Sequence, residues 1–171
     1  TKSLKQLASC LKDNPKNIPA HAVTYLCLLK LGRYDEVIHY FDGEFSDVVI
    51  LGEKTGAIAL AYALKKDEAN TAKYLNLLIV QSKEPEGFTA DSYLFMMYAA
   101  MGDTEKAFDW IRKGIENKSS LLMLRFADPM VNAIKDDPRY KEYQKVIFSL
   151  DSTSSQNKKK MKLLLVLQNI K

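Results

Sequence analysis

Apolar residues recur along most of the chain at the spacing of an amphipathic helix. In the first twelve positions of this pattern, Leu4, Leu7, Ala8 and Leu11 fall on one stripe. The same periodicity continues between Gly, Pro and acidic capping residues. It predicts helices over residues 2–13, 18–31, 34–41, 53–66, 68–82, 89–101, 104–117, 129–135, 138–149 and 158–170. The pattern therefore predicts an all-α protein in which most helices pair as hairpins.

Three of the predicted helix pairs carry related turn sequences at a fixed interval of 35 residues. The turn segments are Gly32–Ile38, Asp67–Lys73 and Gly102–Phe108. A repeat of this length is typical of stacked helical hairpins, which bury their apolar faces only against their neighbours. The interval also predicts that Val37, Ala72 and Ala107 are equivalent, because small side chains there let paired helices approach closely.

The predicted elements form one helical repeat domain over residues 1–150, which holds a half-repeat, three hairpins and two closing short helices. A polar linker at 151–157 and a C-terminal helix at 158–171 follow it. In the closing part, Asp128 and Asp137 each place a capping acid before a proline suited to the first helical position. The leading half-repeat and the first residue, which is not Met, indicate an excised fragment or a processed form.

The net charge of +4 comes from the C-terminal segment. Residues 158–171 contain five lysines and no acid, and the rest of the chain has 20 basic and 21 acidic residues. We therefore expect no direct nucleic-acid contact by the repeat domain. The longest apolar runs fall far short of the roughly 18 residues that a membrane span needs, so we expect no membrane span.

Residues with catalytic or metal-binding potential are few. His21 and His39 lie on different predicted helices, and a metal site would need three or four ligands. Cys10 and Cys27 fall in leucine-rich stretches, where a thiol packs as a small buried apolar side chain. No phosphate-binding loop or nucleophile motif occurs. We expect a non-enzymatic protein without catalytic residues, metal or cofactor, and the unpaired cysteines favour a reducing, cytoplasmic location.

The repeated segments resemble tetratricopeptide repeats. That family has a small residue or Gly between its paired helices, an aromatic residue soon after it and an Ala in the second helix. Gly32 and Tyr34 fit this pattern in the first unit, where Val37 replaces the Ala, and Gly102 and Ala107 fit it in the third unit. The middle unit departs from the pattern, with Asp67 in place of Gly, and the interval is 35 rather than 34. The resemblance covers residues 1–118 and implies a right-handed superhelix of antiparallel helical hairpins.

Residues 102–147 resemble the end of repeat arrays in bacterial transcription-regulatory and signalling proteins. There, a last hairpin precedes an Asp-Pro pair and then an Asp-Pro-Arg-aromatic sequence, which are Asp128-Pro129 and Asp137-Pro138-Arg139-Tyr140 in this chain. The resemblance implies a regulatory context and no activity of its own.

In this architecture the first helix of each hairpin lines a concave groove, which would bind a peptide or helix of a partner protein. The predicted partner-binding residues are Ala22, Leu26, Leu29, Lys30, Ala57, Ala61, Leu64, Lys65, Ser92 and Met96. Apolar side chains with stacked Lys30 and Lys65 suit an apolar partner that carries an acidic group. Alternatively, the chain's own apolar C-terminal helix fills the groove, or that helix mediates self-association.

The function predicted first is therefore that of a non-enzymatic protein–protein interaction module. The alternative is a sensory or regulatory segment of a bacterial transcription regulator whose output domain lies outside this chain.

Overall fold

The computed structural model describes residues 2–42, 52–84, 88–117, 119, 121–126 and 128–149. Every regular element in these ranges is helical, which confirms the predicted all-α class. Within the same ranges, no helix has both the length and the apolar character that a bilayer crossing requires. The predicted linker at 151–157 and helix at 158–171 lie outside the described residues.

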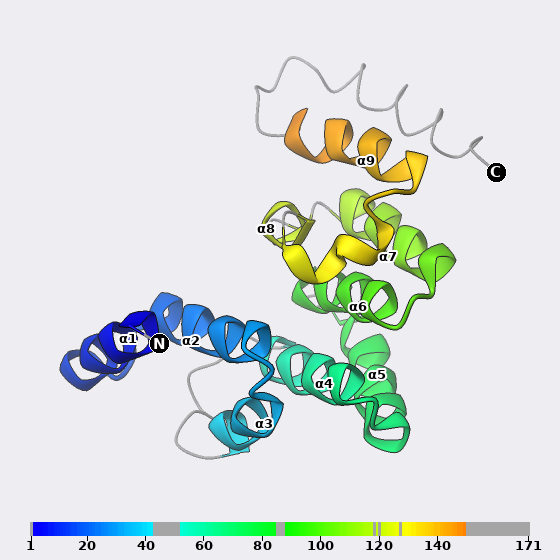
Figure 1. Cartoon of the computed structure of the whole chain (residues 1–171). Helices are drawn as coiled ribbons and strands as arrows, with labels where there is room; N and C mark the ends of the chain where they lie inside the picture. The colour runs from blue at the N-terminus through cyan, green and yellow to red at the C-terminus, as the bar shows by residue number, and fades with distance from the viewer. Residues whose placement is uncertain are drawn as a thin grey trace.

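The elements agree closely with the helices that the apolar pattern predicts (Figure 1). They are α1 (Lys2–Asp13), α2 (Ile18–Lys30), α3 (Tyr34–Asp42), α4 (Glu53–Lys65), α5 (Glu68–Gln81), α6 (Phe88–Ala100), α7 (Thr104–Glu116), α8 (Leu122–Phe126), η1 (Pro129–Ile134) and α9 (Pro138–Ser149). Two details differ from the prediction. The segment η1 is a 3-10 helix, and the short helix α8 precedes it.

The two Asp-Pro sequences form the predicted caps. The Asp128 carboxylate accepts a hydrogen bond from the Met130 N–H at 2.9 Å. The Asp137 carboxylate accepts one from the Arg139 N–H, also at 2.9 Å. Each carboxylate satisfies a backbone donor that the first turn of a helix leaves unpaired.

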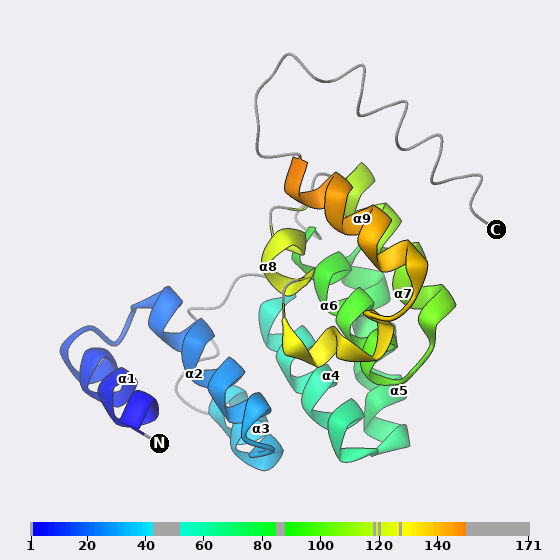
Figure 2. The same cartoon turned by 45° about the horizontal axis from the view of Figure 1, so that its top comes forward.

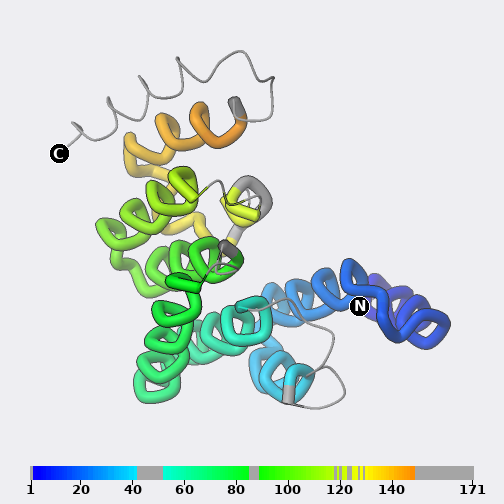
Figure 3. Tube along the Cα trace, turned by 180° about the vertical axis from the view of Figure 1, so that it is seen from behind, coloured from blue at the N-terminus to red at the C-terminus, as the bar shows by residue number. Residues whose placement is uncertain are grey.

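Consecutive helices pack as hairpins, namely α2 with α3, α4 with α5, and α6 with α7. The helix α4 packs against both α3 and α6, so the stack is continuous from α3 to α7. By contrast, α2 and α4 share few contacts. Figures 1 and 2 show α2 leaving the body of the molecule with α1 beyond it, and Figure 3 shows the same arrangement from behind.

The hairpin turns do not follow the 35-residue interval. Each turn closes on a residue with a left-handed backbone, and these residues are Gly32, Lys66 and Gly102. The spacing between them is therefore 34 and then 36 residues. In the second hairpin, Asp67 is the N-cap of α5, since its side chain accepts a hydrogen bond from the Asn70 N–H at 3.1 Å. The turn residue equivalent to Gly32 is thus Lys66, not Asp67.

This shift corrects the prediction about the small residue inside the hairpins. Val37 and Ala107 are fully buried, as expected, but Ala72 is exposed. Thr71, which is only 8% exposed, occupies the equivalent position in α5. Because one residue along a helix is a rotation of about 100°, the shift turns a different face of α5 towards α4.

Candidate functional site

Half of the predicted partner-binding side chains are buried inside the chain. They are Leu29, Ala57, Ala61, Ser92 and Met96, each no more than 2% exposed. The others are half-buried or exposed, namely Ala22, Leu26, Lys30, Leu64 and Lys65. The buried five offer no surface to a partner in this conformation.

The inner face of α6 is covered by α8 and η1, which are together called the closing segment below. Both elements contact α6. The closing segment packs apolar side chains into the core, and Phe126 stacks on the ring of Tyr140 with centroids 4.3 Å apart. The sequence leaves open whether the chain's own C-terminal helix fills the groove. Among the described residues, the closing segment covers the part of the predicted groove that α6 would line.

A buried polar cluster ties the closing segment to three other helices. Arg125 of α8 donates through Nη2 to Glu53 Oε1 at 3.0 Å, to the Tyr25 hydroxyl at 3.0 Å and to the Tyr93 hydroxyl at 2.8 Å. Tyr25 and Tyr93 also donate to the Glu53 carboxylate. Glu53 and Arg125 are 8% and 6% exposed. The four side chains come from α2, α4, α6 and α8, so the cluster is a structural tie between distant parts of the sequence.

The ionisation of the cluster agrees with this structural role. Burial raises the pKa of the Tyr25 and Tyr93 hydroxyls well above the usual value, so both remain protonated donors. Burial opposes the charge of Arg125, but the oxygens of Tyr93, Tyr25 and Glu53 outweigh it and raise the pKa of the guanidinium. The cluster therefore places the Arg125 guanidinium against the Glu53 carboxyl group and two hydroxyl groups in the core.

The two lysines predicted to line the groove are bound to acids of this chain. Lys30 Nζ lies 3.4 Å from Asp128 Oδ2, and Asp128 is the N-cap residue of η1. Lys65 pairs with Asp35 of α3. Each lysine thus already has a carboxylate partner within the chain.

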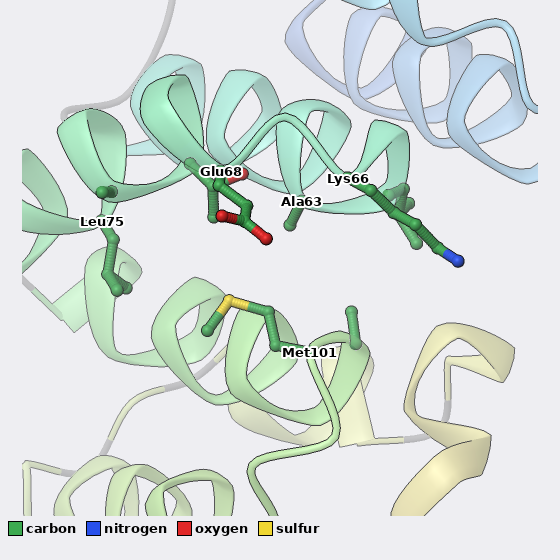
Figure 4. Close-up of a pocket in the computed structure, with 9 residues that line it drawn as sticks. Ala63, Lys66, Glu68, Leu75 and Met101 are labelled. Carbon is green, nitrogen blue, oxygen red and sulfur yellow. The ribbon is translucent and has the colours of Figure 1, made fainter.

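An open pocket of about 570 Å³ lies where the turns of the second and third hairpins meet (Figure 4). Its walls come from the C-terminal end of α4, the first two turns of α5 and the C-terminal end of α6. The lining residues are Ala63, Leu64, Lys66, Glu68, Thr71, Ala72, Leu75, Ala100 and Met101. The volume is within the range of roughly 300–1,000 Å³ that is usual for ligand pockets.

The pocket is mainly apolar and open to the surface. Two thirds of its lining residues are Ala, Leu or Met. Met101 is 44% exposed although it is a large hydrophobic residue, and Figure 4 shows its side chain reaching into the opening opposite Ala63. A methionine side chain adapts easily to different partners because it is unbranched and flexible. The surface is therefore suited to receive an apolar side chain.

Two energetically unfavourable features occur at this pocket. Lys66 has a left-handed backbone with φ of 60°, which costs a non-glycine residue about 1 kcal/mol. The Oγ1 atom of Thr71 is buried and has no hydrogen-bond partner. Strained backbone tends to occur at functional sites. Unpaired buried side-chain atoms are less specific to this place, since the described residues Gln81, Thr89, Asp91 and Arg125 also have one each.

The charged groups at the opening are arranged asymmetrically. In Figure 4 the carboxylate of Glu68 extends over the pocket, whereas the ammonium of Lys66 points away from it. Neither side chain forms an ion pair with another described residue. The pocket thus combines an apolar floor with one available carboxylate.

The sequence reasoning includes Leu64 and misses the other lining residues of the pocket. The sequence does contain an indication of this pocket, because a large apolar residue directly precedes the turn glycine in two of the hairpins. These residues are Leu31 and Met101. These side chains are 46% and 44% exposed. A hydrophobic residue at an exposed turn is informative when it borders a pocket.

The histidine and cysteine residues do not gather into a reactive site. His21 contacts the Tyr40 hydroxyl at 2.5 Å and the Pro15 carbonyl at 2.8 Å, so it joins α2 to α3 and to the preceding loop. In the part of the chain that the structure describes, no group of three His, Cys, Asp or Glu residues could hold a metal ion. The prediction that both cysteines are buried is wrong for Cys10, which is exposed, while Cys27 is half-buried.

Comparison of the chain with protein-family models, with curated proteins and with solved structures gives no match. The fold and the pocket geometry are therefore the basis for a functional proposal, and the tetratricopeptide resemblance stays a prediction.

Proposed function

We propose that the chain is a non-enzymatic protein-interaction module that binds a peptide or helix of a partner protein through the pocket between the second and third hairpins. The observation that carries this proposal is the open apolar pocket itself, lined by Leu64, Ala72, Leu75 and Met101. Partner helices and peptides commonly insert one or two large apolar side chains into such a cavity.

The location differs from the groove that the sequence predicts. The closing segment covers the inner face of α6, and Lys30 and Lys65 have partners within the chain. The pocket lies at the turns of the hairpins and remains accessible. A partner that binds there does not have to displace any buried side chain of the closing segment.

A capture experiment with two alanine variants tests the proposal. Ala72 is exposed and lines the pocket, so Ala72→Arg fills the opening with a long charged side chain. Ala69 is exposed on the same helix and does not line the pocket, so Ala69→Arg is the matched control. Affinity capture of the full chain with quantitative mass spectrometry should identify partners that Ala72→Arg loses and Ala69→Arg retains. A set of partners that both variants retain equally would contradict the proposal.

The tetratricopeptide-like superhelix is part of the same proposal. It is supported by the continuous packing from α3 to α7 and by the left-handed turn residues that recur at Gly32, Lys66 and Gly102. The alternative function, as a segment of a bacterial transcription regulator, rests on the sequence resemblance of residues 102–147 and stays a prediction.

A further inference from the structure

The chemistry of the pocket indicates what kind of partner segment it accepts, provided that the proposed function holds. The floor is formed by alanine and leucine side chains and by Met101, which bind apolar groups without hydrogen-bond requirements. The carboxylate of Glu68 lies over this floor and has no ion-pair partner among the described residues (Figure 4). An apolar group in the pocket would therefore bring its neighbouring residues next to a negative charge.

We infer that the pocket binds a basic amphipathic segment of a partner protein, in which a large apolar side chain stands next to a lysine or arginine. The apolar side chain enters between Leu75 and Met101, and the cation pairs with Glu68. This arrangement removes apolar surface from water and gives the carboxylate a counter-charge at the edge of the interface. A charge of this kind contributes more to partner selection than to total affinity.

An acidic partner fits the same surface less well. It would place a carboxylate beside Glu68, and like charges repel at short distance. Lys66 could attract an acid, but its ammonium points away from the opening (Figure 4). This inference therefore reverses the charge of the partner that the sequence predicts from Lys30 and Lys65.

The sequence provides a suitable probe. The peptide with the sequence of residues 158–171 has five lysines, no acid and the apolar run from Leu163 to Leu167. Fluorescence anisotropy of this labelled peptide should show saturable binding to the full chain. Two further peptides test the chemistry, one with all lysines replaced by glutamate and one with residues 163–167 replaced by serine. We expect both to bind at least about tenfold more weakly, because each removes one of the two recognised features.

Variants of the full chain locate the binding. Glu68→Lys should weaken binding of the peptide about tenfold, whereas Glu116→Lys, an equal charge change on the exposed end of α7, should leave it within about twofold. Ala72→Arg should abolish binding, and Ala69→Arg should not. Thermal unfolding of each variant verifies that it is folded.

The outcomes separate this inference from the proposed function. If Ala72→Arg abolishes binding but Glu68→Lys behaves like Glu116→Lys, the basic partner is wrong and the apolar pocket remains. If neither pocket variant changes binding of the peptide, or if the peptide shows no saturable binding, the inference is overturned. The proposed function is then decided separately by the capture experiment with Ala72→Arg. Because the full chain carries the same sequence, binding is also measured on a chain whose own residues 163–167 are serine. A gain in affinity there would support the same recognition with the chain's own segment as the occupant.

Discussion

The inner face of the hairpin stack and the pocket at its turns are built from the same repeat, yet they differ in how completely the rest of the chain covers them. On the inner face, the closing segment covers α6, and Arg125 gives Glu53 a counter-charge in the core. At the turns, Lys66 keeps a strained backbone and Thr71 has an unpaired hydroxyl. Unpaired buried polar atoms occur in both regions, since the Arg125 Nε also has no partner. The regions differ in that this chain covers the inner face of α6, whereas the pocket stays open to the surface.

The difference arises from a single residue of register. The second hairpin closes one residue earlier than the 35-residue interval predicts, which places Lys66 at the turn and Thr71 inside the hairpin. The third hairpin uses Gly102 and Ala107 at the same two positions, and neither is unfavourable there. The irregular hairpin is also the one that carries the pocket.

The largest effect should follow from breaking the buried ion pair of the inner face. Arg125→Leu removes the cation and leaves the Glu53 carboxylate buried without a counter-charge. Loss of one partner from such a pair costs about 3–5 kcal/mol. Urea unfolding followed by circular dichroism measures this loss. The control is Arg112→Leu, which breaks a surface pair with Asp109 and should cost about 0–1 kcal/mol. Equal losses for the two variants would remove the distinction between core and surface.

A smaller loss should follow from Gly56→Ala. A methyl group at this position would overlap the ring of Tyr93, which belongs to the same buried cluster. Overpacking a well-filled core costs about 1–3 kcal/mol. The matched control is Gly114→Ala, where the added carbon would lie 3.2 Å from a terminal methyl of Leu122 that can move aside. Unfolding free energies should show the larger loss for Gly56→Ala, and the reverse order would contradict the tight contact between α4 and α6.

The third prediction concerns the pocket and has the opposite sign. Thr71→Val keeps the shape of the side chain and replaces the unpaired hydroxyl with a methyl group, as at the equivalent Val37. We expect the free energy of unfolding to rise by about 1 kcal/mol, because a buried unpaired hydroxyl is removed. The control is Thr24→Val, which loses a 2.8 Å hydrogen bond to the Ala20 carbonyl and should lower stability by about the same amount. A destabilised Thr71→Val would mean that the hydroxyl has a partner in solution.

Sequence reasoning predicts the helices well because their ends depend on local chemistry. The capping carboxylates of Asp128 and Asp137 begin helices as expected. The register of the second hairpin could also be predicted from the sequence, because Asp67 and Asp103 are both good N-cap residues for the second helix of their hairpins. Alignment of these two caps gives 36 residues rather than 35. The glycine-based alignment fails because the turn residue of that hairpin is a lysine.

The buried cluster could not be predicted in the same way. Arg125 and Glu53 are 72 residues apart, and their contact depends on where the closing segment folds back. A lone arginine in an apolar stretch gives no indication of its partner. The pocket is similar, because it forms between turns whose relative position depends on the packing of α4, α5 and α6. Such features depend on tertiary structure. The periodic pattern of apolar residues does not give the distances between residues that are far apart in the sequence.

The smallest effect should come from the left-handed turn residue itself. Lys66→Gly relieves the backbone strain and should raise the free energy of unfolding by up to about 1 kcal/mol, partly offset by the greater flexibility of glycine in the unfolded chain. Gly102→Lys is the reciprocal change, and a Cβ atom added at Gly102 would lie in open space, with nothing within 4 Å outside the neighbouring residues of the chain. It should therefore lower stability by a similar amount through strain alone. Thermal and urea unfolding of the two variants measure both values. If Lys66→Gly does not stabilise the chain while Gly102→Lys destabilises it, the two turns differ in backbone conformation, and the 34- and 36-residue spacing would have to be given up.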